Sequence, residues 1–145
     1  KSIILGLIIT WSIMSESIFI FDYYRYPIIP IKFIYKEKET PIIDALLDSG
    51  GDFIVIPMPI ASYLGLKLKK AGSVDTAGGT TLLYKANLNM IMGKKDNKVI
   101  YNNLQIHVSV RNDIPVLIGR YPIFEDYEIT FIKQKNQLIL KSINQ

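Results

Sequence analysis

Residues 44–52 of this chain read Asp-Ala-Leu-Leu-Asp-Ser-Gly-Gly-Asp, and this stretch decides the fold. The mostly apolar run over 42–47 predicts a buried β-strand, and the glycines after it allow a tight turn with close backbone contact. A carboxylate, that of Asp48, therefore stands at the end of a strand. Because an Asp-Ser-Gly tripeptide also occurs in ordinary turns, where Asp and Ser bond the local backbone, the motif needs its context to indicate a function.

Length and composition predict one mostly β domain. A chain of 145 residues with 49% hydrophobic content can bury one core and is too short for two. Isoleucine dominates the aliphatic residues, and 9 Tyr and 6 Phe add aromatic side chains that suit pleated surfaces. We expect the domain to span 25–145 and to follow an apolar N-terminal extension, 1–24.

The N-terminal extension has two interpretations that the sequence leaves open. Its apolar run over 2–14 follows Lys1 and resembles the hydrophobic region of a signal sequence or a truncated anchor, which would associate the chain with a membrane. The run is shorter than the ~18 residues that a membrane span needs. It is also rich in β-branched residues and interrupted by Gly6, which favours a buried or intersubunit β-strand. The compartment stays unassigned.

Several classes of chemistry are excluded by residues that the chain lacks. There is no cysteine, so disulfides, thiolate metal sites and cysteine nucleophiles are ruled out. His107 is the single histidine, which excludes the common zinc sites, and we expect no metal and no cofactor. Ser49 and His107 lack the third partner that a serine protease requires. The net charge of +4 comes from lysines scattered along the chain, so we expect solvated turns and no nucleic-acid partner.

Periodicity and turn residues predict the remaining elements. A short helix is expected over Pro59–Leu64, because proline stands near its start and Gly65 follows its end. Residues 72–81 are rich in Gly, Ser and Thr and predict an exposed hairpin or loop. Pro27 and Pro30 should lie at strand edges or bends. We expect a strand region over 18–35 that breaks at those prolines, then a charged turn and a strand over 42–47. Further strands are expected over 53–56, 82–92, 99–110 and 115–119. A helical turn over 120–126 and a hairpin over 128–140 should complete the chain.

Three motifs in a fixed order give the chain a resemblance to a known family. The first is the 44–52 segment, the second is Val-Leu-Ile-Gly-Arg over 116–120, and the third is the Gly-rich stretch over 75–80 between them. Together they resemble the signature turn, the hydrophobic-hydrophobic-Gly segment and the flap of the retropepsins, the single-domain aspartic proteases, over about residues 28–141. The resemblance implies a mostly β fold, a closed six-stranded-type acid-protease barrel with one or two short helices.

The resemblance also implies a reaction. Retropepsins hydrolyse peptides with two carboxylates, and this chain offers one suitable Asp-Ser-Gly turn, so a symmetric homodimer would supply the pair from two copies of Asp48. The pair would share a proton and activate a water that attacks the scissile carbonyl. Ser49 and Gly50 are expected beside Asp48 as positioning residues. The chain would then be an aspartic endopeptidase that acts on extended segments of peptide or protein substrates.

The resemblance assigns further residues to the cleft. Asp52 would contact a substrate backbone or Arg120, or would cap the turn. Two departures from the family are the absence of Tyr or Trp at the flap tip and the N-terminal extension. The expected substrate contacts are Gly51, Asp52, Ala77, Gly78, Gly79 and Ile118, and Gly119 with Arg120 should support the dimer and the active site.

Two other functions remain open on the sequence alone. A retropepsin-fold dimer could bind peptides or partner proteins with little or no cleavage, because a fold does not fix a function. A β-domain tethered to a membrane by residues 2–14 would depend on that segment more than on Asp48. Loss of the Asp48 carboxylate would abolish a protease and leave a binding module intact.

Overall fold

A computed structural model describes residues 18–76 and 79–143 of the chain. The segment 2–14 lies outside these residues, so neither interpretation of it is tested, and Ala77 and Gly78 also lie outside them. No helix in the described part is long and apolar enough to cross a membrane. The strands are β1 (Ile18–Asp22), β2 (Ile28–Tyr35), β3 (Lys38–Glu39), β4 (Ile43–Leu47), β5 (Val55–Pro57), β6 (Lys69–Thr76), β7 (Gly79–Lys94), β8 (Asn97–Ser109), β9 (Leu117–Ile118), β10 (Tyr127–Ile132) and β11 (Gln137–Ser142), and the helices are α2 (Met58–Leu64), α3 (Ile123–Asp126) and the 3-10 turn η1 (Lys133–Lys135).

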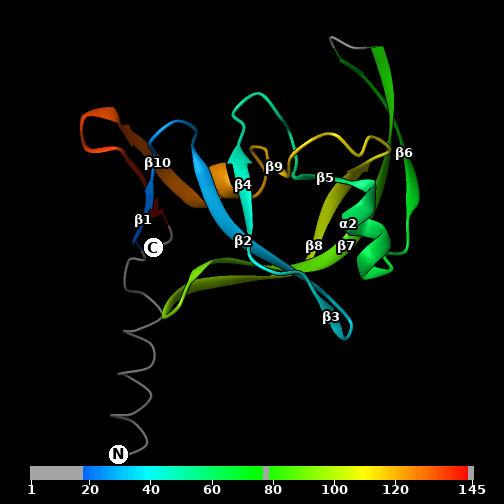
Figure 1. Ribbon diagram of the computed structural model, residues 1–145, viewed down its shortest axis with the longest axis horizontal. Coiled ribbons are helices and arrows are strands. Elements are labelled where there is room, and N and C mark those ends of the chain that lie inside the picture. The colour runs from blue at the N-terminus through cyan, green and yellow to red at the C-terminus, as the bar shows by residue number, and fades with distance from the viewer. Residues whose placement is uncertain (1–17, 77–78, 144–145) are drawn as a thin grey trace, which may run out of the picture.

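Strand β2 closes a barrel by pairing with two different strands along its length. Its first half, 28–31, pairs antiparallel with β4, and its second half, 31–34, pairs antiparallel with β7. The closed ring runs β2, β4, β9, β5, β8, β7 and back to β2, while β3 and β6 extend it at β2 and β7. In Figure 1 the barrel strands lie at the centre, and the β6–β7 hairpin extends from them at the upper right. The predicted mostly β, closed six-stranded barrel is confirmed.

Pro30 lies inside β2 and not at one of its ends. It is buried and stands opposite Asp44 of β4, one residue before the ladder with β7 begins at Ile31. Proline has no N–H to donate, so it is best tolerated where a strand has a partner on one side only. We expected Pro30 at an edge or a bend, and the change of partner along β2 supplies the equivalent of an edge.

A second, three-stranded sheet combines strands from both ends of the described chain. β11 lies between β1 and β10, and both pairings are antiparallel. Phe19, Leu138 and Leu140 of this sheet are buried in the common core. At the β7–β8 turn, Asn97 donates its side-chain amide to the Ile18 carbonyl at 2.9 Å. The predicted C-terminal hairpin is therefore confirmed, and its third strand, β1, comes from residues 18–22, which we had assigned to the N-terminal extension.

Isoleucine and leucine fill most of the core, together with valine, alanine, aromatic and methionine side chains. Alternate residues of a strand face this interior, as in β8, where Leu104, Ile106 and Val108 are buried. Each large side chain that leaves water contributes about 1.5–3 kcal/mol to folding, before the entropic cost of ordering the chain. The largest fully buried side chains are those of Phe19, Phe33, Ile29, Ile31, Ile54, Ile56, Met90, Met92, Ile106, Ile118, Ile123 and Leu138.

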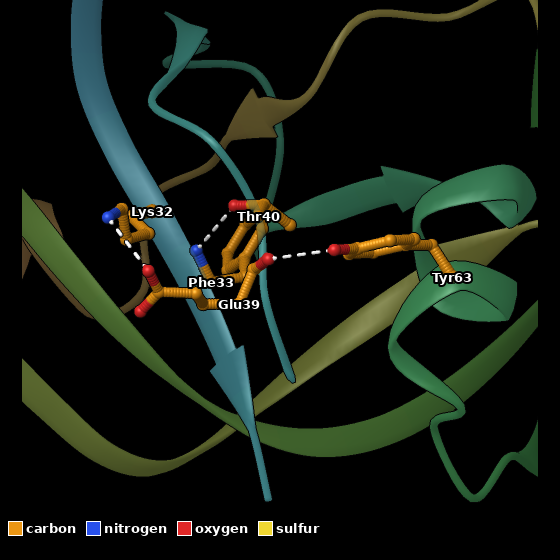
Figure 2. Close-up of polar contacts among 5 residues, drawn as sticks. All are labelled: Lys32, Phe33, Glu39, Thr40 and Tyr63. Atoms are coloured by element: carbon orange, nitrogen blue, oxygen red, sulfur yellow. Dashed lines mark hydrogen bonds and ion pairs between the residues drawn. The ribbon is translucent and has the colours of Figure 1, made fainter. Parts of the chain in front are cut away.

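Helix α2 and the β2–β3 hairpin hold each other at the side of the barrel. The helix ends at Gly65, which takes a left-handed conformation with φ 71° and donates its N–H back to the last turn. Tyr63 of α2 donates its hydroxyl to the Glu39 carbonyl at 3.2 Å, as Figure 2 shows. Lys38 donates its ammonium to the Tyr63 carbonyl at 3.2 Å. The predicted helix and the hairpin before β4 are both confirmed.

Thr40 joins β2 at two points, next to this hairpin. Its N–H donates to the Phe33 carbonyl at 2.9 Å, and its hydroxyl oxygen accepts the Phe33 N–H at 3.0 Å. Figure 2 shows the second bond. Both residues are buried, so the hydroxyl satisfies a backbone donor that lies away from water.

Replacement of Thr40 by valine should destabilise the fold. Thr40→Val keeps the shape of the side chain and removes the acceptor of a buried N–H, so the free energy of unfolding should fall by about 1–3 kcal/mol. Urea denaturation followed by circular dichroism measures the change. Thr40→Ser keeps the oxygen and should lose clearly less, whereas equal losses in the two variants would show that the hydrogen bond is unimportant.

Candidate active site

Asp48 stands at the end of β4, next to the strand that carries the second motif. β4 pairs in parallel with β9, and Leu46 donates its N–H to the Val116 carbonyl at 2.9 Å. Asp48 continues the ladder, because its own N–H donates to the Ile118 carbonyl at 2.8 Å. The residue is half-buried. Its carboxylate therefore projects from a backbone position that two strands fix.

The turn after Asp48 is held in part by a hydrogen bond to the Asp48 carboxylate. Gly50 donates its N–H to one carboxylate oxygen at 3.0 Å, and Gly51 donates its N–H to the Asp48 carbonyl at 3.3 Å. A Cβ atom at Gly50 or at Gly51 would lie 3.3 Å from a carboxylate oxygen, which is tighter than ordinary van der Waals contact. Both glycines therefore leave room for the carboxylate, and Gly50 supplies its hydrogen bond, while Ser49 beside them is exposed.

Gly119 brings the chain after β9 against the same turn, backbone to backbone. A Cβ atom at Gly119 would lie 2.8 Å from both the Gly51 carbonyl oxygen and the Phe53 nitrogen, and these main-chain atoms cannot rotate away. Arg120 donates its N–H to the Gly51 carbonyl at 2.8 Å. The two motifs that are far apart in the sequence thus meet through main-chain atoms.

The Arg120 side chain contacts two residues of the turn that follows Asp48. Its guanidinium forms an ion pair with Asp52 and also donates to the Ser49 carbonyl at 3.4 Å. The two charged side chains are 53% and 71% exposed, so the pair contributes only about 0–1 kcal/mol to stability. Of the roles expected for Asp52, the contact with Arg120 is present in the structure.

An aromatic cluster beside the turn was not indicated by the sequence. The Phe53 ring lies 4.7 Å from the His107 ring and 6.1 Å from the Tyr121 ring, measured between centroids. Burial, followed by the positive charge of Lys85, lowers the pKa of His107, and Asp52 opposes this shift. Because the rings come from three separate segments, no local pattern could have revealed that they meet.

The other predicted substrate contacts lie in different environments. Ile118 is completely buried, and its side chain packs in the hydrophobic core of the chain. Gly79 opens β7 with φ 115° and pairs with Thr76 of β6. The expected exposed hairpin is confirmed, while Ala77 and Gly78 belong to the part that is not described.

A cavity of about 540 Å³ is distinct from the Asp48 turn. It lies between β1, the loop after β1 and the β7–β8 turn, and its lining includes Phe21, Tyr24 and Tyr26. Within residues 18–76 and 79–143, no group of three or more His, Cys, Asp or Glu residues could hold a metal ion.

Comparison with known proteins agrees with this architecture. No family model matches the chain, and no curated protein matches it. Among solved structures, a retropepsin-like aspartic protease from Rickettsia conorii matches with a TM-score of 0.66 and 22% identity, over 86% of this chain and 98% of that chain. The EIAV protease complexed with the inhibitor HBY-793 matches with a TM-score of 0.52 and 14% identity, over 72% of this chain and 91% of that chain. The fold of this chain is retropepsin-like.

A side chain at position 119 should disrupt the turn. Gly119→Ala places a methyl group among main-chain atoms of Gly51 and Phe53, so the free energy of unfolding should fall by about 2–3 kcal/mol. Chemical denaturation measures the loss. Gly65→Ala is the control, because Gly65 has a positive φ but open space around it, and it should lose only about 1 kcal/mol. Equal losses would mean that close packing at Gly119 is not the cause.

Acidification should destabilise the chain in part through His107. Folding lowers the pKa of His107, so the unfolded chain binds this proton more tightly than the folded chain. The contribution of neutral His107 is therefore complete above its ordinary pKa of 6.5 and is lost as the pH falls below that value. Between about pH 7.5 and pH 5.5 the Tm of the wild type should fall further than that of His107→Gln. The same fall in both proteins would contradict this assignment.

Proposed function

We propose that this chain is an aspartic endopeptidase that acts as a homodimer and hydrolyses extended peptide segments. The observation that carries the proposal is the Asp48 carboxylate, which ends a barrel strand and accepts the Gly50 N–H at 3.0 Å. A carboxylate fixed in this way keeps one orientation and can serve as a general acid or base. The retropepsin-like fold supports the proposal, because the matching structure from Rickettsia conorii is described as an aspartic protease.

The reaction requires two carboxylates, and each chain supplies one in this setting. A two-fold axis next to Asp48 would bring two copies of the residue together. Two carboxylates in contact cannot both ionise at low cost, so they share a proton and titrate as a pair. The ionised member deprotonates a water that attacks the scissile carbonyl. The protonated member stabilises the oxyanion and then gives its proton to the leaving amine.

The residues around Asp48 take supporting roles in this proposal. Ser49 is exposed beside the carboxylate and would hydrogen-bond across the pair to the partner copy. Gly50 positions the carboxylate, and Gly119 and Arg120 hold the turn against β9. None of these residues acts as a nucleophile, so no covalent intermediate forms.

An extended peptide would lie between the Asp48 turn and the β6–β7 hairpin, which would act as the flap. This hairpin projects from the barrel in Figure 1. Main-chain groups at the turn and at the hairpin tip would pair with the peptide backbone, as in strand addition, and alternate peptide side chains would enter apolar pockets. The proposed contacts are Gly51, Asp52, Ala77, Gly78 and Gly79.

Peptide binding with little or no cleavage is the second candidate function. The observation that favours it is the composition of the hairpin tip, where residues 77–79 read Ala-Gly-Gly and carry no aromatic side chain. The two candidates use the same cleft and differ in whether the carboxylates complete the reaction. Replacement of the Asp48 carboxylate by an uncharged amide distinguishes the two candidate functions, because only cleavage needs the carboxylate.

Asp48→Asn should abolish cleavage of a denatured protein or a peptide library. The amide keeps the shape of the side chain and cannot exchange the proton, so the rate should fall at least about 100-fold. Asp44→Asn is the matched control, because Asp44 is an exposed carboxylate on the same strand, and it should cleave like the wild type. Equal activity in all three proteins would refute the assignment of Asp48. Binding of peptide without cleavage in any of them would favour the second candidate.

Mixing the wild-type chain with the Asp48→Asn chain tests directly whether activity needs one Asp48 from each of two copies. If activity needs one Asp48 from each copy, a ninefold excess of the Asp48→Asn chain should leave about one tenth of the activity per wild-type chain, because random pairing consumes the wild type in mixed dimers. The chains are mixed under conditions that allow exchange, and the rate is followed over time. Unchanged activity would show that a single chain carries out the reaction.

A further inference from the structure

A groove on the outer side of the barrel is lined by cations and amides and by no carboxylate. It has a volume of about 430 Å³, and its charged residues are Lys67, Lys69 and Lys85. The side-chain amides of Asn87, Asn103 and Gln105 and the Tyr35 ring complete most of the lining. We call this feature the lysine groove. It is lined by residues of β2, β6, β7 and β8 and by Lys67 before β6, and nothing in the proposed reaction uses these residues.

The lysine groove continues into a smaller hollow at one end. That hollow, of about 130 Å³, shares Tyr35, Asn87 and Asn103 with it and adds Lys36. The two hollows together are therefore lined by four lysines and by the amides of Asn87 and Asn103, which they share. Several cations around adjoining hollows suit a ligand with several acidic groups better than a single small ion.

Among the described residues, Lys67, Lys69 and Lys85 are not members of the ion pairs Lys32–Glu39, Arg111–Asp113 and Arg120–Asp52. Lys69 of β6 stands directly opposite Lys85 of β7, and Lys85 stands opposite His107 of β8. Directly opposite residues of antiparallel strands share a face of the sheet, and like charges in such a pair are destabilising. The charge of Lys85 reaches His107, where it helps to lower the pKa of the imidazole.

We propose that the lysine groove binds an extended, acidic peptide segment. Lys67 and Lys69 are two positions apart and both line the groove, and in an extended peptide the side chains on one side repeat at about 6.6–7 Å, or every second residue. Acidic side chains at alternate positions can therefore meet successive lysines. Bound carboxylates would also relieve the repulsion between Lys69 and Lys85.

The lining favours a peptide over a nucleic acid. Side-chain amides both donate and accept, so Asn87, Asn103 and Gln105 can pair with peptide N–H and carbonyl groups. Proteins that hold single-stranded nucleic acid instead present several aromatic rings and arginines on which bases stack. This groove has one ring, that of Tyr35, and no arginine. The inference concerns binding and does not depend on cleavage at Asp48.

Binding of a labelled peptide to the full chain tests the proposal. The peptide has about eight residues with Glu at alternate positions, and its partner has Gln in place of Glu. Fluorescence anisotropy is measured with the Asp48→Asn chain, so that cleavage cannot interfere. The acidic peptide should bind and the Gln peptide should bind at least about tenfold more weakly. The triple variant Lys67→Gln, Lys69→Gln and Lys85→Gln should raise the Kd of the acidic peptide about tenfold or more.

The control variant also removes three positive charges, but from the turn that joins β7 and β8. Lys94, Lys95 and Lys98 are exposed and cluster at the β7–β8 turn, and their replacement by Gln should change the Kd by less than about twofold. The single variants Lys67→Gln and Lys69→Gln alter exposed side chains only, so they report on the groove even if the triple variant folds poorly.

Three results would overturn the proposal. The first is that the acidic peptide does not bind. The second is that both triple variants weaken binding equally, which would indicate attraction by net charge alone. The third is that a single-stranded oligonucleotide of equal charge binds more tightly and through the same lysines. If the wild type does not cleave peptides, that result would contradict the proposed endopeptidase activity. It would leave the binding proposal for the lysine groove unaffected.

Discussion

Main-chain contact between Gly119 and the turn over 48–53 is the constraint on which the rest of the structure depends. Strand β9 has two residues, and it links β4 to β5 in the barrel because Leu117 pairs with Leu46 on one side and with Val55 on the other. A side chain at position 119 would push the turn away from this strand. Closure of the barrel and the position of the Asp48 carboxylate are therefore set by the same few backbone atoms.

This dependence on backbone contacts accounts for a shared architecture at low sequence identity. The matching structure from Rickettsia conorii has 22% identity and a TM-score of 0.66 over most of both chains. Ladder hydrogen bonds and alternating burial require apolar character at the inner positions and few particular side chains. The outer faces are under no such constraint, so their side chains can vary without a change of fold. His107, between Lys85 and Phe53, lies where the outer face meets the turn.

Sequence patterns that span only a few residues correctly predicted most of the helices and strands. Helix α2 was indicated by Pro59 near its start and Gly65 past its end, and the barrel strands by their apolar pattern. The complete burial of Ile118 could not be predicted in this way. Both neighbours of that position in the sequence are also small or apolar, and the alternation of a two-residue strand is too short to show which face is buried.

The sequence alone was enough to predict that the chain is mostly β, that Asp48 follows a strand, and that the two glycines after it allow a tight turn. Only the tertiary structure decided what surrounds that carboxylate. Residue 119 meets residue 51, Arg120 meets Asp52, and Phe53 meets His107 because β4, β5, β8 and β9 are neighbours in one closed barrel. Such pairings depend on which strands lie side by side, and this follows from burial of the whole core and not from any local pattern.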